Sequence, residues 1–156
     1  MPRIAVGGTF EFLHDGHKVL LQKALDISGN EQIDIGLTSD AMAQKKGRSI
    51  PDYNTRVKQL EDFLESCSAK KESYTIQKLE DPYGTTLTKN YDYIVVSPET
   101  LPIALKINEI REQSGLKTIT IVEIGYVLAE DDIPISSTRI VKGEIDSHGK
   151  LKGTKL

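Results

Sequence analysis

Residues 4–17 read IAVGGTFEFLHDGH and are the most informative stretch of the chain. The apolar run at residues 4–6 predicts a short buried strand, and the glycines at 7–8 predict a tight turn, because glycine tolerates backbone angles that strain other residues. From about Gly16 onward, apolar residues recur at helical spacing, and Gly29 predicts the end of that helix. The chain therefore opens with a predicted strand, turn and helix.

The same alternation continues along the rest of the chain. Further strands are predicted at residues 33–37, 74–79, 93–96 and about 118–124, and further helices at 54–66 and about 99–113. Nearly continuous apolar strands that alternate with helices indicate a mostly parallel sheet covered on both faces. We predict one α/β domain over residues 1–156, with a Rossmann-like, doubly wound fold of about five strands. The polar residues from about 144 to 156 are expected to form a tail that frays.

The composition excludes several classes of protein. The 156 residues include 20 Lys and Arg against 23 Asp and Glu, so the net charge is −3. A weakly acidic chain binds anions at a local site and not over a broad basic surface, so we expect no nucleic-acid partner. Cys67 is the only cysteine, which rules out an intramolecular disulfide. No apolar run approaches the roughly 18 residues of a membrane span, so we expect no membrane partner and a cytoplasmic location.

The predicted turn after the first strand carries residues suited to phosphate. His14 and His17 are three residues apart, so on the first turn of a helix they share a face. Two imidazoles there can donate hydrogen bonds to phosphate oxygens, and the backbone N–H groups of the helix N-terminus favour an anion. The stretch matches neither the G-x-G-x-x-G fingerprint nor the G-x-x-x-x-G-K-[ST] loop, which disfavours a hydride-transfer enzyme and a P-loop ATPase.

A second anion-binding segment lies near the other end of the chain. Ser136, Ser137 and Thr138 place hydroxyls and backbone N–H groups at a predicted helix N-terminus, and Arg139 adds positive charge. Taken alone, Ser136 is equally well explained as a helix N-cap. Together with the histidine pair, the segment indicates a second part of one phosphate site.

These two segments resemble the motifs of the nucleotidyltransferase superfamily. Gly8-Thr9-Phe10 with His14-x-Gly16-His17 resembles its H-x-G-H signature, and residues 135–140, which read ISSTRI, resemble its I-S-S-T-x-[IV] motif. Residues 81–86 (DPYGTT) and 94–100 (IVVSPET) are similar to one branch of the superfamily, the archaeal and eukaryotic phosphopantetheine adenylyltransferases. The resemblance runs from about residue 3 to residue 146. It implies adenylyl transfer from ATP to 4′-phosphopantetheine, which yields dephospho-coenzyme A and pyrophosphate.

The resemblance also implies a role for each site residue. His17 would stabilise the transition state at the α-phosphate, and His14 would bind the neighbouring triphosphate oxygens. The remaining nucleotide contacts would come from Gly8, Thr9, Phe10, Gly16, Ser136, Ser137, Thr138 and Arg139. Thr9 with Lys45 or Lys46 would hold the acceptor phosphate, and Lys46 is slightly favoured as the catalytic lysine. Arg56 occupies the place of a family arginine, although a surface arginine is nearly as well supported, and site roles for Asn108 and Arg111 are weaker expectations.

The remaining alternatives concern the metal, the acceptor and the class of protein. No resident metal is expected, and Mg²⁺ should arrive with ATP, held by its phosphates. A zinc site on His14 and His17 fails on ligand count, and the acidic residues 130–132 are better explained as a solvated turn than as metal ligands. Related enzymes use the same chemistry on nicotinamide mononucleotide, FMN or glycerol 3-phosphate. A non-catalytic nucleotide-binding domain is the alternative from another class.

Overall fold

A computed structural model describes residues 3–29, 32–44, 49–67 and 69–152. Its strands are β1 (Ile4–Gly8), β2 (Ile33–Thr38), β3 (Tyr74–Leu79), β4 (Tyr93–Val96) and β5 (Thr120–Glu123). Its α-helices are α1 (Asp15–Ser28), α2 (Asp40–Ala43), α3 (Tyr53–Ser66), α4 (Leu101–Gln113) and α5 (Ser137–Val141), and two short 3₁₀ helices are η2 (Lys71–Ser73) and η3 (Gly84–Leu87).

The five strands form one parallel sheet in the order β3-β2-β1-β4-β5. Ile4 of β1 pairs with Ile33 of β2 on one side and with Tyr93 of β4 on the other. The chain thus winds outward from β1 in both directions, and the order reverses between β1 and β4. This arrangement confirms the predicted doubly wound α/β class, and it places a crevice at the carboxyl ends of β1 and β4.

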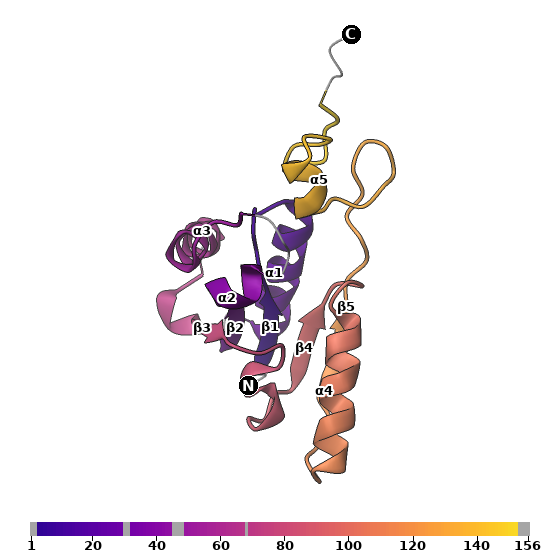
Figure 1. Ribbon diagram of the computed structural model, residues 1–156. Helices are drawn as coiled ribbons and strands as arrows, with labels where there is room; N and C mark the ends of the chain where they lie inside the picture. The colour runs from indigo at the N-terminus through magenta and orange to yellow at the C-terminus, as the bar shows by residue number, and fades with distance from the viewer. Residues whose placement is uncertain (1–2, 30–31, 45–48, 68, 153–156) are drawn as a thin grey trace.

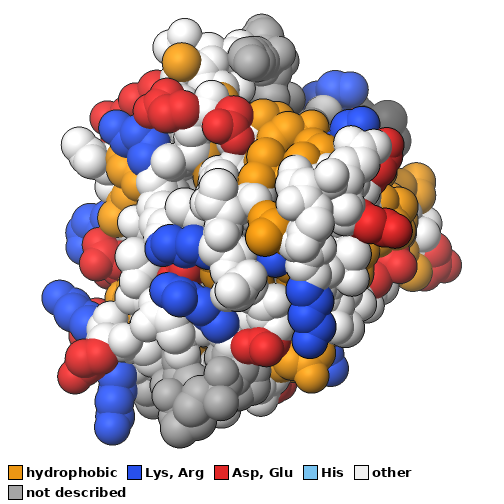
Figure 2. Space-filling view, turned by 90° about the horizontal axis from the view of Figure 1, so that it is seen from below, with side chains coloured by type: hydrophobic (Ala, Val, Ile, Leu, Met, Phe, Trp, Pro, Cys, Tyr) orange, Lys and Arg blue, Asp and Glu red, His pale blue; other side chains and the backbone are white. Residues whose placement is uncertain are grey.

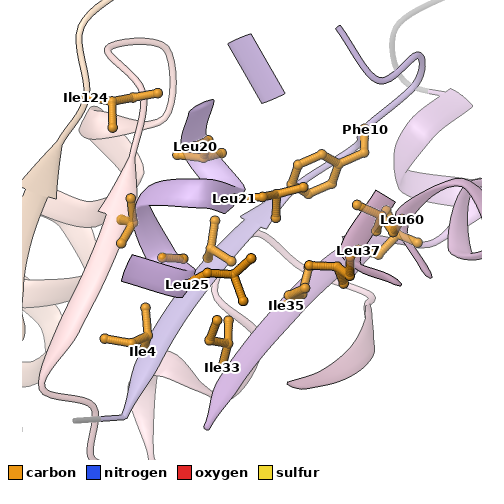
Figure 3. Close-up of a cluster of buried hydrophobic side chains, with 14 residues drawn as sticks. Ile4, Phe10, Leu20, Leu21, Leu25, Ile33, Ile35, Leu37, Leu60 and Ile124 are labelled. Atoms are coloured by element: carbon orange, nitrogen blue, oxygen red, sulfur yellow. The ribbon is translucent and has the colours of Figure 1, made fainter. Parts of the chain in front are cut away.

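One face of the sheet packs against α1 and α3 in an apolar core (Figure 3). Alternate strand residues point to this face, because successive side chains of a strand lie on opposite sides. The buried cluster consists of Ile4, Val6, Phe10, Leu20, Leu21, Ala24, Leu25, Ile33, Ile35, Leu37, Leu60, Leu64, Val95 and Ile124. This layer holds β1 and α1 rigidly together, so the turn between them is well positioned.

The opposite face of the sheet is less filled. Ile94 and Val96 of β4 pack there against Ala104 and Ile107 of α4. The neighbouring strands contribute small or polar residues on this side, namely Ala5, Gly7, Asp34, Gly36 and Thr38. Small side chains leave room above the sheet, and a cavity lies there.

The last part of the described chain forms a small layer at the carboxyl edge of the sheet, around α5 at the top of Figure 1. Isolated antiparallel bridges pair Leu128 with Pro134 and Ile145 with Leu151. Ile145 is fully buried against Ala129 and Ile135. The expectation of a fraying tail from residue 144 is therefore wrong up to residue 152, because one apolar residue within the polar stretch anchors it.

The face at the amino end of β1 carries basic and acidic side chains side by side, and apolar side chains show between them in several places, most extensively above and to the right of the centre of the view (Figure 2). Within the described ranges, no helix combines the length and the apolar character needed to cross a membrane.

Candidate active site

A cavity of about 370 Å³ opens at the carboxyl ends of β1 and β4 and continues along the less filled face of the sheet. Both sequence motifs contribute to its wall. Its lining includes all but one of the described residues that were predicted to contact nucleotide or catalyse transfer: Gly8, Thr9, Phe10, His14, Gly16, His17, Ser136, Ser137 and Thr138. The fold therefore brings together two segments that lie at opposite ends of the chain.

The turn after β1 depends on an unusual backbone conformation at Phe10. Its φ of 48° lies in the left-handed region, which is uncommon for a residue other than glycine. The Phe10 side chain is 2% exposed and packs in the core, which stabilises this conformation. A Cβ at Gly8 would lie 3.2 Å from the Phe10 ring. The tight turn thus brings residues 8–10 to the cavity wall while the Phe10 side chain stays packed in the core.

His14 is the N-cap of α1. Its Nδ1 accepts hydrogen bonds from the backbone N–H groups of Gly16 (3.0 Å) and His17 (3.3 Å). An imidazole nitrogen that accepts these bonds carries no hydrogen, so in the neutral ring the hydrogen lies on Nε2. A Cβ at Gly16 would lie 2.8 Å from His14 Cε1, so this position has no room for a side chain.

His17 lies on the first turn of α1 and stacks on His14. The ring centroids are 3.7 Å apart, and the ring planes differ by 17°. His17 Nδ1 lies 2.9 Å from the carbonyl oxygen of Phe12, to which it donates when it carries a hydrogen. It also lies 3.4 Å from the backbone nitrogen of His14, from which it accepts when it carries none. The stack and these backbone bonds fix both imidazoles against the cavity wall.

The first-turn N–H groups of α1 are already bonded within the protein. Gly16 and His17 donate to His14, and Asp15 donates to the carbonyl oxygen of Ser147 at 3.0 Å. The expectation that these N–H groups would bind phosphate is therefore wrong for this structure. The two imidazoles are the groups of this turn that remain suited to contact phosphate oxygens.

The second motif also contributes to the cavity wall. Ser136 is the N-cap of α5, and its Oγ accepts from the N–H of Arg139 at 3.2 Å. The N-cap interpretation of Ser136 is thus correct, and the residue lines the cavity as well. Ile135 anchors the segment from below, since it is 7% exposed and packs on Ala129 and Ile145.

Arg139 is the predicted nucleotide contact that the structure does not bring into the cavity lining. Its guanidinium forms ion pairs with Asp131 and with Glu144, and it donates to the carbonyl oxygens of Ile133 and Pro134. The hydrogen bond from Arg139 lowers the pKa of Asp131 below its ordinary value. The interpretation of residues 130–132 as a simple solvated turn is therefore incomplete, because Asp131 ties this turn to α5.

The sequence misjudged, or left undecided, the roles of Arg56, Asn108 and Arg111. Arg56 is fully buried in α3 and is no surface residue. Arg111 is 1% exposed and donates to the carbonyl oxygens of Thr86, Lys89 and Lys117, so it fastens η3 to α4. The Asn108 amide bonds both backbone groups of Ile119. Arg111 and Asn108 thus hold elements together and do not line the cavity.

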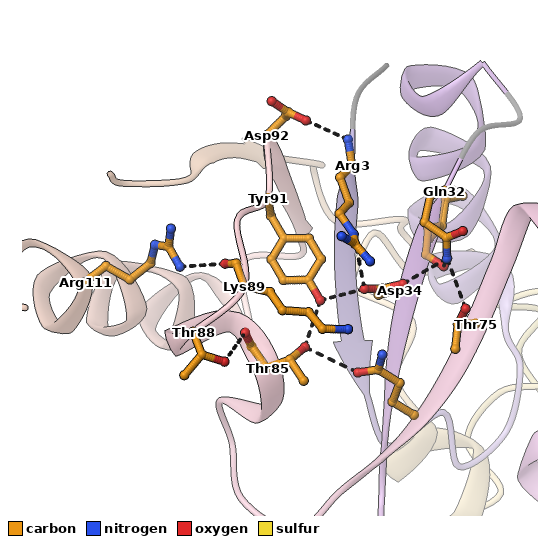
Figure 4. A network of polar contacts seen from close by, with 12 residues as sticks. Arg3, Gln32, Asp34, Thr75, Thr85, Thr88, Lys89, Tyr91, Asp92 and Arg111 are labelled. Atoms are coloured by element: carbon orange, nitrogen blue, oxygen red, sulfur yellow. Dashed lines mark hydrogen bonds and ion pairs between the residues drawn. The ribbon is translucent and has the colours of Figure 1, made fainter. Parts of the chain in front are cut away.

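The sequence did not reveal the polar inner end of the cavity (Figure 4). The Tyr91 hydroxyl donates to Asp34 Oδ2 at 2.7 Å and lies 2.8 Å from Thr85 Oγ1, which in turn donates to Gln77 Oε1 at 3.3 Å. Arg3 lies 3.7 Å from the same Asp34 oxygen. Burial raises the pKa of Tyr91 to about 12. These residues come from β2, β3, the segment before β4 and, for Arg3, the residue before β1, and their separation in sequence hides the network.

The remaining predicted residues, Lys45 and Lys46, lie outside the described residues. Among the described residues, no three His, Cys, Asp or Glu side chains group in a way that could hold a metal ion.

The sheet order, the stacked histidines and the serine-rich segment of the cavity wall together define an α/β nucleotidyltransferase domain. The chain belongs to the cytidylyltransferase-like family, whose model matches residues 5–143. The sequence resemblance to this superfamily is therefore confirmed.

Two curated relatives show how far the similarity extends. A protein of Methanosarcina acetivorans named phosphopantetheine adenylyltransferase is 55% identical over 152 residues, which cover 97% of each chain. A protein of the same name from Archaeoglobus fulgidus is 45% identical over 96% of this chain and 99% of its own. These relatives confirm the predicted archaeal branch.

Solved structures agree with this fold. An Archaeoglobus fulgidus protein described as of unknown function is 42% identical, with a TM-score of 0.71 over 78% of this chain and 88% of its own. A Thermoplasma volcanium protein described as a lipopolysaccharide core biosynthesis protein shares the fold at 22% identity, with a TM-score of 0.56 over 80% of this chain and 96% of its own.

Proposed function

We propose that this chain transfers the adenylyl group of ATP to 4′-phosphopantetheine, giving dephospho-coenzyme A and pyrophosphate in the cytoplasm. One observation carries the proposal: the histidine pair and the serine-rich segment, which resemble the catalytic motifs of such enzymes, line a single cavity. Relatives that carry this enzyme's name match almost the full chain, which supports the choice of acceptor.

The reaction joins the acceptor phosphate to the α-phosphorus of ATP. An oxygen of the acceptor phosphate forms the new bond, while the bond from the α-phosphorus to the bridging oxygen of the β-phosphate breaks. The electron pair leaves with pyrophosphate. An alkyl phosphate has a second pKa of about 6, so its oxygen is already ionised near neutral pH and no general base is needed. Catalysis then depends on positioning and on stabilising charge.

The histidines are suited to that stabilisation. Negative charge grows on the α-phosphate oxygens and on the leaving oxygen in the transition state, and preorganised donors lower its energy. His17 would donate to the α-phosphate through an Nε2–H, which requires either that its Nδ1 accepts from the His14 N–H or that the ring is an imidazolium. His14 would donate through its Nε2–H to the next phosphate, a division that the stacked rings allow. The bonds of both rings to the backbone of residues 12–17 keep the donors oriented before ATP arrives.

The serine-rich segment would hold the rest of the nucleotide. Ser136, Ser137 and Thr138 offer hydroxyl groups to the β- and γ-phosphates, whereas Arg139 would contribute through its electrostatic field or after breaking an ion pair. We propose Lys46 or Lys45 as the cation at the acceptor phosphate. Mg²⁺ enters as part of the Mg-ATP substrate, held by phosphate oxygens.

The inner part of the cavity suits the pantetheine arm. Its floor is made of Ala5, Gly7 and Gly36, and its walls include Ile94 and Ile107. A largely apolar lining of this kind suits a linear chain. The arm also carries amide groups, and these would meet the polar inner end described above, where hydroxyl and amide side chains line the cavity. With its phosphate near Thr9, the acceptor would then lie along the sheet.

The test of the proposed function is pyrophosphate release from Mg-ATP with 4′-phosphopantetheine, measured beside nicotinamide mononucleotide, FMN and glycerol 3-phosphate, and repeated with CTP. We expect release with ATP and phosphopantetheine alone. Release with another acceptor would overturn the proposed acceptor but keep the chemistry. Binding of ATP without release in any mixture would move the chain to the non-catalytic class.

A histidine variant tests the catalytic assignment. His17→Ala should lower kcat by at least about 100-fold, a loss typical of removing one preorganised donor, while the Kd for ATP changes far less. Gln22→Ala is the control on the same helix, because Gln22 is exposed and does not line the cavity. Unchanged turnover in His17→Ala would overturn the assignment.

A further inference from the structure

Arg56 anchors a chain of hydrogen bonds that ends at the cavity. Its side chain is fully buried, and its Nη1 donates to Thr38 Oγ1 at 3.1 Å, to the Thr38 carbonyl oxygen at 2.9 Å and to the Thr9 carbonyl oxygen at 3.1 Å. Nε donates to the carbonyl oxygen of Pro51 at 2.8 Å, and Nη2 pairs with Asp40 at 3.0 Å. A guanidinium carries five N–H donors and no acceptor, and here the two hydrogens of Nη1 are shared among three oxygens. The direction of every one of these bonds is therefore fixed.

Because Arg56 can only donate, it also fixes the direction of the hydrogen bond made by the Thr38 hydroxyl. A hydroxyl has one hydrogen, and Thr38 Oγ1 already accepts from Arg56. Its own hydrogen points to Thr9 Oγ1, 3.2 Å away, which is the acceptor that the described part of the chain presents to it. Thr38 is 8% exposed, so water competes little for this bond.

The same argument fixes the Thr9 hydroxyl. Because Thr9 Oγ1 accepts from Thr38, its hydrogen has to point away from Thr38. Thr9 lies at the end of β1 on the wall of the cavity, between the histidine turn and the inner part of the cavity. A hydroxyl held as a donor there is matched to an anionic oxygen and mismatched to another donor.

We propose that Arg56 and Thr38 are positioning residues that orient the Thr9 hydroxyl as a hydrogen-bond donor toward a phosphate oxygen in the cavity. The inference rests on the proposed function for the identity of that phosphate. The positive charge of Arg56 polarises the chain, and consecutive bonds in one direction strengthen each other in a region with little water. Neither Arg56 nor Thr38 needs to touch the reacting atoms.

A double-mutant cycle on Thr38 and Thr9 tests this chain. Thr38→Val keeps the shape of the side chain, removes its hydroxyl and leaves the bonds of Arg56 to backbone carbonyls intact. We expect kcat/KM for phosphopantetheine to fall between about 10-fold and about 100-fold, as for the loss of one hydrogen bond to a charged group. Thr38→Ser, which keeps the hydroxyl, should restore most of the activity. Thr120→Val is the control for the same change at an exposed strand threonine on β5.

The decisive measurement is Thr38→Val in a Thr9→Val background. If Thr38 acts through Thr9, the second substitution adds little to the first, so the two losses are strongly non-additive. Losses that multiply, or a Thr38→Val enzyme as active as wild type, would overturn the proposal. The same cycle is measured on the Kd for Mg-ATP. That readout keeps the inference testable if the wild-type chain shows no turnover with phosphopantetheine, an outcome that would overturn only the proposed function.

Discussion

At the scale of single residues, His14 has two tasks that use different atoms. Its Nδ1 caps the first turn of α1, and the same bonds hold the ring against His17 and the cavity. A helix cap is worth about 0.5–2 kcal/mol, so the bond that orients the ring also stabilises the helix. Gly16 makes both possible, because any Cβ there meets the imidazole.

Gly16→Ala should therefore damage the site more than the fold. The new Cβ would lie 2.8 Å from His14 Cε1, so the ring has to turn and its cap bonds weaken. We expect kcat to fall by at least about tenfold, since misplaced donors lose their effect on the transition state, with a loss of stability near 1 kcal/mol.

Gly29→Ala provides the control for Gly16→Ala. Gly29 ends α1 with a φ of 60° and no atom within 4 Å of an added Cβ, so alanine there strains the backbone far from the cavity. This substitution should lower the free energy of unfolding by about 1–2 kcal/mol, a loss similar to that of Gly16→Ala, without lowering kcat. Equal kcat losses in the two variants, measured below both melting temperatures, would contradict the proposed role of Gly16.

Tyr91 should make the free energy of unfolding fall in alkaline solution. Burial raises its pKa from 10.0 to about 12, so the folded protein holds the phenolic proton more tightly than the unfolded chain does. This contribution is fully present below pH 10 and is lost as the pH rises toward 12. Tyr91→Phe should lower stability at pH 8 by about 1–3 kcal/mol, because Asp34 loses a buried donor, and should show a shallower decline above pH 10. Urea unfolding at pH 8, 10 and 11 measures the loss at pH 8 and the decline above pH 10. If the free energy of unfolding falls equally with pH in the wild type and in Tyr91→Phe, the raised pKa of Tyr91 is contradicted.

At the scale of secondary structure, the sequence predicted most elements to within two residues. Apolar runs such as 93–96 and the spacing of Leu60 and Leu64 are local signals, and local signals locate strands and helices. The partners of Arg56 could not be predicted, because they lie up to 47 residues away in sequence. A signal for its burial was present, since Arg56 is in phase with Leu60 and Leu64 on the buried stripe of α3.

The site was predicted in outline for the same reason. Two short motifs located His14, His17 and Ser136, whereas the bond that occupies the Asp15 N–H comes from Ser147, at the far end of the chain. The inner end of the cavity depends on Asp34 and Tyr91, which are 57 residues apart. Contacts of this kind follow from the sheet topology and leave no local pattern.

The short helix α5 should make part of the stability sensitive to acid. A hydrogen bond from Arg139 holds the pKa of Asp131 below its ordinary value of 3.8. The ion pair therefore contributes stability above pH 3.8, and this contribution is lost as the pH falls through the lowered pKa. Asp131→Asn should be less stable at pH 7 and should lose less on acidification from pH 5 to pH 2. Asp62→Asn, in an exposed pair with Lys58, is the control and should follow the wild-type curve. Thermal unfolding across this range measures the difference, and parallel wild-type and Asp131→Asn curves would contradict the prediction.

At the scale of the whole molecule, the C-terminal layer joins the two halves of the site. Ser147 accepts from Asp15 at the start of α1, and His148 lies 2.9 Å from the Asp15 carboxylate. Gly149 accepts from Glu130, next to the turn that holds α5. Residues 145–151 therefore contact both the start of the histidine helix and Ile135, next to the serine-rich segment. We expect them to set the distance between these two parts of the cavity wall.

Gly149→Ala should uncouple these two parts of the cavity wall while leaving the sheet intact. Gly149 has a φ of 81°, and an added Cβ would lie 2.8 Å from both Ala129 Cα and Ile135 Cδ1. The backbone of Ala129 cannot yield as a flexible side chain would, so the C-terminal layer has to shift, and the serine-rich segment moves with Ile135. Gly143→Ala is the matched control, because its φ of 77° brings the same backbone strain with no atom within 4 Å.

We expect Gly149→Ala to lose at least about tenfold more kcat/KM than Gly143→Ala, because a misplacement of about 1 Å is enough for such a loss. Amide hydrogen exchange should show faster exchange at residues 129–151 and unchanged protection in β1, β2 and β4. Equal activity in the two variants, or loss of protection throughout the sheet, would show that the C-terminal layer does not set the geometry of the site.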